Sequence, residues 1–181
     1  IASCENMTGP KAYKPDDVVK AYNGKTIEVI NTDAEGRIVL SDALSYAVEL
    51  KAAEIVDMAT LTGACIVGLG LYTAGLMGND PRLVGRILKA AGEAGEKIWE
   101  LPLDDELRAD IKSDVADIKN AGSRWGGAIT AAMFLEHFVA DTPWAHIDLA
   151  GPAYAEREGE FHPKGGTGFG VRTIIDYILG L

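Results

Sequence analysis

Residues 26–53 carry the sequence Thr26-Ile-Glu-Val-Ile-Asn-Thr-Asp-Ala-Glu-Gly-Arg-Ile-Val-Leu-Ser-Asp-Ala-Leu-Ser-Tyr-Ala-Val-Glu-Leu-Lys-Ala-Ala53. The first five residues alternate polar and β-branched side chains, which predicts a half-buried or edge strand. A polar turn over residues 31–36 interrupts that strand, and residues 38–53 then place apolar side chains at helical spacing. A strand, a polar turn and a helix in this order are typical of a layered α/β fold.

Strand and helix patterns keep alternating along the rest of the chain. The sequence predicts strands at 54–60, 73–77 and 144–149, and helices at 81–97, 104–112, 128–139 and 171–179. Residues 1–25 are broken by glycine and proline, and we expect a loop there with at most one short element. The pattern therefore predicts an α/β fold, which we expect to be a three-layer α/β/α sandwich around a mixed, mostly parallel sheet.

The chain has 181 residues and a formal net charge of −10, from 17 Lys and Arg against 27 Asp and Glu. This charge argues against binding to nucleic acid or to an anionic membrane surface, because affinity for both comes mostly from Lys and Arg. Two cysteines, Cys4 and Cys65, are too few for disulfide bonds to stabilise a domain of this size. No apolar run reaches the roughly 18 residues of a membrane span. The chain begins with Ile1, and no signal-peptide pattern follows it. We expect a cytoplasmic protein whose first residue is not a natural translation start.

The run Asn31-Thr-Asp-Ala-Glu-Gly-Arg37 holds the densest chemistry of the chain. If strand geometry continues through it, Asp33 and Glu35 point to the same side at about 7 Å, where a divalent metal would relieve their repulsion. Gly36 allows a sharp turn into the helix, and the planar fork of Arg37 suits a carboxylate-like or carbonate-like anion. The alternative is a polar turn in which Asp33 caps the helix and Arg37 pairs with Glu35. The spacing alone leaves both interpretations open.

Other candidate groups have weaker support. His146 and Asp148 lie on the same side of the predicted strand 144–149, but its apolar neighbours favour a buried strand over a metal site. We expect Cys65 to be a small buried side chain. The glycine-rich run 165–170 lacks the lysine of a phosphate-binding loop, and we expect it to be a flexible loop.

The letters of residues 31–37 are the signature of the leucine (cytosol) aminopeptidases, and the chain resembles this family along its whole length. The further matches, in chain order, are Glu5-Asn-Met7, Ala59-Thr-Leu-Thr-Gly-Ala64, His146-Ile-Asp-Leu-Ala-Gly151 and Thr167-Gly-Phe-Gly-Val-Arg172. The resemblance implies an exopeptidase that removes an N-terminal residue, preferably leucine, from peptides.

The resemblance also implies roles for individual residues. Asp33 and Glu35 would be ligands of a pair of divalent ions, Zn²⁺ or Mn²⁺, and Arg37 would hold a bicarbonate ion that serves as general base. The residues that would line the substrate site are Thr60, Leu61, Gly63, Ala150 and Ala153. The family has a methionine where Ala153 stands, so we expect a wider pocket for the first side chain.

The family's remaining metal ligands and its electrophilic lysine, which precede the signature, cannot be placed in this sequence. We therefore expect residues 1–181 to be a partial C-terminal catalytic domain, without the N-terminal domain and the first catalytic strands, and inactive by itself. The complete protein would be a cytoplasmic homo-hexamer that acts on peptides. The alternative is a non-catalytic fragment that serves as an oligomerisation or assembly module.

Overall fold

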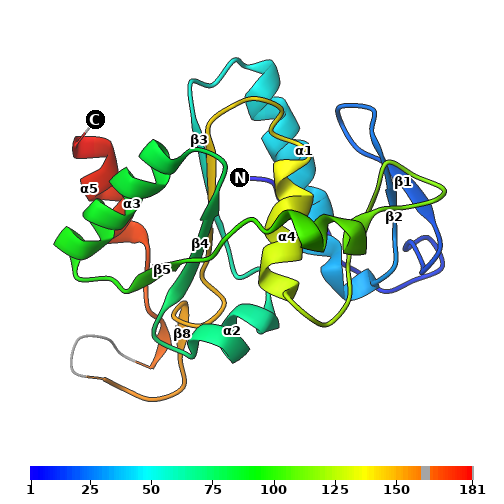
Figure 1. Ribbon diagram of the computed structural model, residues 1–181. Coiled ribbons are helices and arrows are strands. Elements are labelled where there is room, and N and C mark those ends of the chain that lie inside the picture. The colour runs from blue at the N-terminus through cyan, green and yellow to red at the C-terminus, as the bar shows by residue number, and fades with distance from the viewer. Residues whose placement is uncertain (160–163, 181) are drawn as a thin grey trace. The chain divides into compact units, whose positions relative to one another are not determined.

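The computed structural model describes residues 1–159 and 164–180, which form two compact units. One unit combines residues 1–55 and 104–142, and the other combines residues 56–103 and 143–181. Figure 1 labels the helices and strands along the chain.

The first unit contains a small mixed sheet. Its strands are β1 (Val18–Lys20), β2 (Thr26–Glu28) and β6 (Ile118–Lys119), with β2 in the middle. β1 runs antiparallel to β2, and β6 runs parallel to it, with Ile27 opposite Ile118. Both of these isoleucines are buried, so the sheet contributes to the core of this unit.

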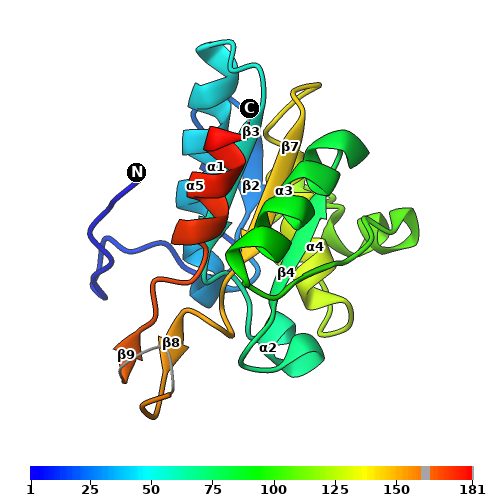
Figure 2. The ribbon, with the colours of Figure 1, turned by 90° about the vertical axis from the view of Figure 1, so that its left-hand side faces the viewer.

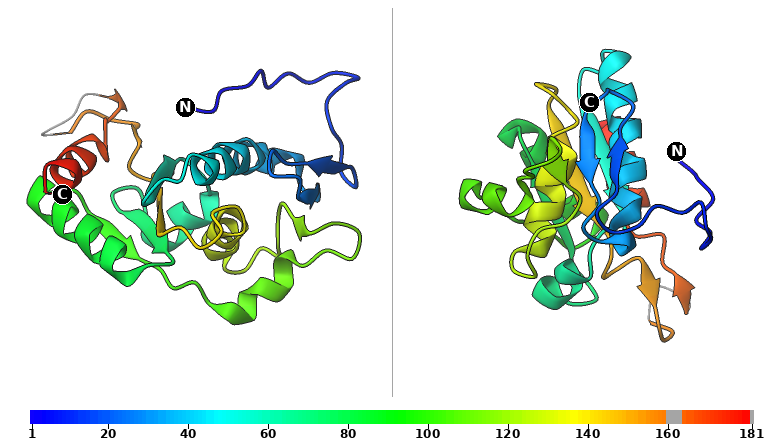
Figure 3. Two further views of the ribbon diagram at one scale, coloured as in Figure 1. Left: turned by 90° about the horizontal axis from the view of Figure 1, so that it is seen from above. Right: turned by 90° about the vertical axis from the view of Figure 1, so that its right-hand side faces the viewer.

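Helical elements make up most of the rest of the first unit. They are the 3-10 turns η1 (Thr32–Ala34) and η2 (Asp105–Ile111) and the helices α1 (Glu35–Glu49) and α4 (Gly127–Glu136). α4 and α1 lie side by side, and η2 packs on α4 (Figure 3). Almost every side chain of α4 is buried, because its sequence is apolar on all sides.

The second unit is built on a sheet in the order β3 (Ile55–Ala59), β7 (Trp144–Asp148), β4 (Ala74–Gly78) and β5 (Ile98–Glu100). β4 runs antiparallel to β7 and parallel to β5. The short helix α2 (Gly63–Leu69) follows β3. The small ribbon of β8 (Tyr154–Ala155) and β9 (Gly165–Gly166) is antiparallel.

Helices α3 (Pro81–Ala94) and α5 (Val171–Leu179) pack against each other and cover this sheet (Figure 2). Their shared core contains Leu83 and Ile87 from α3, Tyr177 from α5, and Leu76 and Ile147 from the strands. The ends of α3 carry residues that commonly begin and end helices. The Asp80 side chain caps the start of α3, Pro81 occupies its first position, and Gly95 ends it in a left-handed conformation.

The expected α/β class with mixed strand pairing is confirmed, and the strands of residues 1–159 and 164–180 fall into three sheets. The helix expected at 38–53 begins three residues earlier and ends at Glu49. The segment expected to be a helix at 104–112 is a 3-10 turn, and the turn expected at 61–64 leads directly into α2. No helix in the described part of the chain combines the length and apolar character needed to cross a membrane.

Candidate active site

The signature 31–37 forms a tight turn that leads into a helix. The Asn31 side chain accepts a hydrogen bond from the Asp33 amide at 2.9 Å and caps η1. Asp33 therefore lies in a 3-10 turn, and Glu35 is the first residue of α1. Strand geometry does not continue through Asp33 and Glu35, so the condition for their pointing to the same side of a strand is not met, because the Asn31 cap turns the chain before Asp33. The helix cap of the alternative interpretation is not formed either, because α1 begins after Ala34 without a side-chain cap, and the Asn31 side chain caps η1 instead.

The two acidic side chains of this turn still offer oxygen atoms to a cation. Asp33 is exposed, and among the described residues no hydrogen bond or ion pair reaches its carboxylate. Among the described residues Glu35 accepts one bond, from the side-chain Nδ2 of Asn6 to Oε1 at 3.0 Å, which leaves its second oxygen available. Carboxylate oxygens fit a hard divalent ion. In residues 1–159 and 164–180, however, no three His, Cys, Asp or Glu side chains converge as a complete metal site, so this turn offers part of one.

Asn120 holds the signature turn in place. Its side chain is fully buried, and its Oδ1 accepts from the amides of Ile30 at 2.8 Å and Asn31 at 3.2 Å. Its Nδ2 donates to the Asn31 carbonyl at 2.7 Å. Its own carbonyl accepts from Nη1 of Arg37 at 2.9 Å. One residue therefore fixes the backbone before Asp33 and also orients the Arg37 guanidinium. Sequence reasoning missed Asn120, because 83 residues separate it from Arg37.

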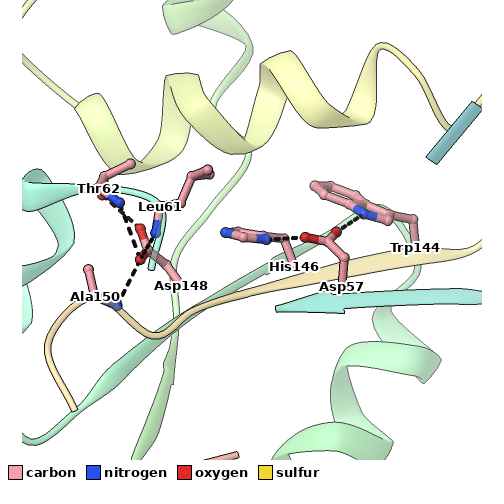
Figure 4. Close-up of polar contacts among 7 residues, drawn as sticks. All are labelled: Asp57, Leu61, Thr62, Trp144, His146, Asp148 and Ala150. Atoms are coloured by element: carbon pink, nitrogen blue, oxygen red, sulfur yellow. Dashed lines mark hydrogen bonds and ion pairs between the residues drawn. The ribbon is translucent and has the colours of Figure 1, made fainter. Parts of the chain in front are cut away.

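In the second unit, Asp148 joins two turns that lie far apart in the sequence. Its Oδ1 accepts from the amides of Leu61 and Ala150, both at 3.1 Å, and its Oδ2 accepts from the Thr62 hydroxyl at 2.7 Å (Figure 4). Asp148 is fully buried. Of the residues expected to line the substrate site, Leu61 and Ala150 are therefore brought together on one carboxylate.

The other expected substrate residues flank these two. Thr60 is exposed directly after β3, and Gly63 is exposed at the first position of α2. Ala153 closes the turn after β7, since its amide donates to the Leu149 carbonyl at 3.0 Å. All five expected substrate residues lie in the second unit, whereas Asp33, Glu35 and Arg37 lie in the first.

His146 belongs to a separate buried cluster. Its Nδ1 lies 2.5 Å from Oδ1 of Asp57, and the indole of Trp144 donates to the other oxygen of Asp57 at 2.6 Å (Figure 4). Every residue of β7 is buried. His146 and Asp148 are therefore parts of internal hydrogen-bond networks on a buried strand, as their apolar neighbours predicted.

Cys65 lies in α2, and only 1% of its surface is exposed, as expected. Burial, reinforced by the negative charge of Asp148, raises the pKa of the Cys65 thiol to about 11. The thiolate is the reactive form of cysteine, and a raised pKa keeps this side chain in its neutral thiol form at neutral pH.

Known proteins resemble the chain in sequence and in fold. The family described as cytosol aminopeptidase family, catalytic domain, matches residues 1–175. A probable cytosol aminopeptidase of Aquifex aeolicus is 60% identical over 99% of the chain, and one of a Sulfurihydrogenibium species is 58% identical over 99%. The chain spans only 37% and 36% of these two relatives.

A solved structure of a tomato leucine aminopeptidase mutant matches 99% of the chain with a TM-score of 0.94 and 44% sequence identity. The match covers 35% of the tomato chain. Because the family match includes the signature turn, both substrate-side turns and the start of α5, the chain belongs to the cytosol aminopeptidase family, whose catalytic-domain description it matches.

Proposed function

We propose that the protein is a metal-dependent aminopeptidase that releases N-terminal residues, preferably leucine, from peptides. The observation that carries the proposal is the signature turn, in which the Asp33 carboxylate is exposed and has no partner among the described residues. An exposed carboxylate that no protein group engages keeps its oxygen atoms available, and a metal is bound by the deprotonated carboxylate.

The residues of the signature turn would have separate roles in the reaction. Asp33 and Glu35 would hold part of a pair of divalent ions, Zn²⁺ or Mn²⁺. Such ions lower the pKa of a bound water and polarise the scissile carbonyl. The guanidinium of Arg37, oriented by the Asn120 carbonyl, would hold a bicarbonate ion that accepts a proton.

The substrate would be aligned by the residues of the second unit. The Leu61 carbonyl would accept a hydrogen bond from the peptide, beside Thr60 and Gly63. Ala150 and Ala153 would line the pocket for the first side chain, and the small size of Ala153 favours a broad preference there.

The proposal is tested by hydrolysis of a leucyl chromogenic amide, using the protein at its native length with added Mn²⁺ or Zn²⁺. We expect turnover that depends on the metal and is abolished in Asp33→Ala without loss of the folded state. Asp114→Ala is the matched control, because it removes the same charge from another exposed position and should retain activity. A folded wild-type protein that hydrolyses no aminoacyl amide with either metal would overturn the proposal.

An assembly role is the second candidate. Under the main proposal the protein is a cytoplasmic hexamer, and light scattering should give a mass six times that of its chain. If Asp33→Ala changed the mass but the wild type showed no turnover, the protein would instead be a non-catalytic assembly module. A strict monomer at high concentration would contradict both the hexamer and the assembly module.

A further inference from the structure

The buried carboxylate of Asp148 lies where the turn after β3 meets the turn after β7. Beyond its bonds to the Leu61 and Ala150 amides, it receives a longer bond from the Thr62 amide at 3.4 Å. The Thr62 hydroxyl, which donates to Asp148 at 2.7 Å, accepts from the Cys65 amide at 3.0 Å and so caps α2. Asp148 therefore holds two loop backbones and, through Thr62, the start of a helix.

These bonds fix the directions of particular carbonyl groups. The peptide bonds of these two turns, like the others among the described residues, are trans, and in a trans peptide the N–H and C=O groups point to opposite sides. The Thr62 amide points toward Asp148, so the carbonyl of Leu61 points away from it. This carbonyl is the group proposed to accept a hydrogen bond from the substrate.

The same argument applies to the turn after β7. The Ala150 amide points toward Asp148, so the Leu149 carbonyl points away, where it accepts from the Ala153 amide at 3.0 Å. The next residue, Gly151, is held closely, since a Cβ atom there would lie 2.3 Å from the Gly70 carbonyl oxygen. Asp148 thereby orients the turn that carries both proposed pocket residues, Ala150 and Ala153.

We propose that Asp148 is a positioning residue that locks these two turns together and so sets the alignment of the substrate between the Leu61 carbonyl and the pocket at Ala150. The inference rests on the proposed function for the roles of Leu61 and Ala150. Asp148 itself does not contact the substrate, because its surface is fully buried. A misplacement of about 1 Å in a substrate-aligning group can lower catalysis by about 100-fold.

The test compares steady-state kinetics of wild type, Asp148→Asn, Thr62→Val and Thr62→Ser, with the protein at its native length and a leucyl amide as substrate. We expect Asp148→Asn and Thr62→Val to lower kcat/KM by about 10- to 100-fold. Thr62→Ser keeps the hydroxyl and should restore near wild-type values.

Thr173→Val is the matched control. Thr173 is buried in the same unit, and its hydroxyl donates to the buried Glu96 carboxylate at 2.6 Å. The control therefore loses the same kind of hydrogen bond and should lower the melting temperature while leaving kcat/KM unchanged. If Thr173→Val lowered kcat/KM as much as Thr62→Val, or if Asp148→Asn had wild-type kinetics, the positioning role would be overturned.

Hydrogen exchange separates this inference from the proposed function. Asp148→Asn replaces a charged acceptor by a weaker neutral one, so the amides of Leu61, Thr62 and Ala150 should all exchange faster than in wild type. Both turns must respond together. If the wild type had no peptidase activity, the proposed function would fail, and the exchange of these two segments would still decide whether Asp148 couples them. Faster exchange in one turn alone would overturn the coupling.

Discussion

A buried carboxamide has to satisfy donors and acceptors together, and Asn120 does so with the backbone that leads into the signature turn. Its Oδ1 accepts from the amides of Ile30 and Asn31, and its Nδ2 donates to the carbonyl of Asn31. No charged side chain could satisfy both the donors and the acceptors at this position. The geometry of the turn therefore requires an asparagine at position 120. The acidic residues that the turn presents depend on this geometry for their positions.

Asn120→Ala should lower both stability and metal affinity. Loss of the carboxamide leaves the amides of Ile30 and Asn31 and the carbonyl of Asn31 without this partner. A fully buried unsatisfied group costs about 1–3 kcal/mol, and because these groups are only partly buried, solvation should reduce the total to about 2–4 kcal/mol. Because Asp33 follows directly on this backbone, the affinity for Mn²⁺ should fall as well. Chemical denaturation and calorimetric titration measure the two effects.

The control for Asn120→Ala is Asn23→Ala, at an exposed asparagine whose Oδ1 accepts from the Lys25 amide at 3.1 Å. It should lower stability by a few tenths of a kcal/mol and leave metal affinity unchanged. Equal losses of stability in the two variants would show that the buried network of Asn120 contributes little.

At the scale of elements, local chemistry decided what could be predicted. The start of the helix from Pro81 was predicted, because Asp80 and Pro81 mark it in the sequence, but its end was placed at residue 97 although α3 ends at Ala94, where Gly95 stops it. Helix α2 was missed, because the cap of Thr62 depends on Asp148, which is 86 residues away. The start of α1 was placed too late, because Glu35 and Gly36 lack the apolar spacing by which the helix was recognised.

In the candidate site, too, local features could be predicted from the sequence and long-range contacts could not. The identities of Asp33, Glu35 and Arg37 followed from a local signature, whereas their conformation did not, because it depends on Asn31 and on the distant Asn120. The contact of Leu61 and Ala150 with one carboxylate likewise joins segments that no local pattern relates. Long-range hydrogen bonds from a buried side chain leave no periodic trace in the sequence.

The cap of α3 predicts a pH-dependent contribution to stability. Asp80 accepts from the Leu83 amide at 2.9 Å and the Arg82 amide at 2.8 Å, and these bonds, with the Arg82 side chain, hold the pKa of the carboxyl below its usual range. A lowered pKa means that this stabilisation is present above the ordinary pKa of aspartate and is lost as the pH falls through the folded-state value. At pH 7, Asp80→Ala should lower the melting temperature by about 2–4 °C.

Thermal unfolding followed by circular dichroism between pH 7 and pH 3 measures this effect. The difference between wild type and Asp80→Ala should narrow toward the acid end, as the carboxyl becomes protonated. Asp80→Asn is the control, since its carbonyl oxygen still caps the helix but does not titrate. A difference between wild type and Asp80→Ala that stayed constant over this range would argue against the charged cap.

At the scale of the whole molecule, each unit combines segments that are far apart in the sequence. Residues 1–55 form the first unit together with residues 104–142, so the signature turn and Asn120 come from different segments of one unit. The turn is therefore held by protein hydrogen bonds within its own unit, and under the proposed function we expect it to keep its structure without the metal. Folding should then be independent of metal binding, and this can be tested on the whole protein.

Removal of metal with a chelator should abolish activity and leave the protein folded, with an unchanged far-ultraviolet circular dichroism spectrum. Return of Mn²⁺ should then raise the melting temperature, because a ligand that binds only the folded state stabilises it by about 2.7 kcal/mol at 100 times its Kd. For a chain of this size that corresponds to about 5–10 °C. Asp33→Ala should melt close to the metal-free wild type and show no rise with Mn²⁺, whereas Asp114→Ala should show the full rise. If the chelator unfolded the wild type, the signature turn would depend on the metal for its structure, and the Asn120 network would not be sufficient to hold it.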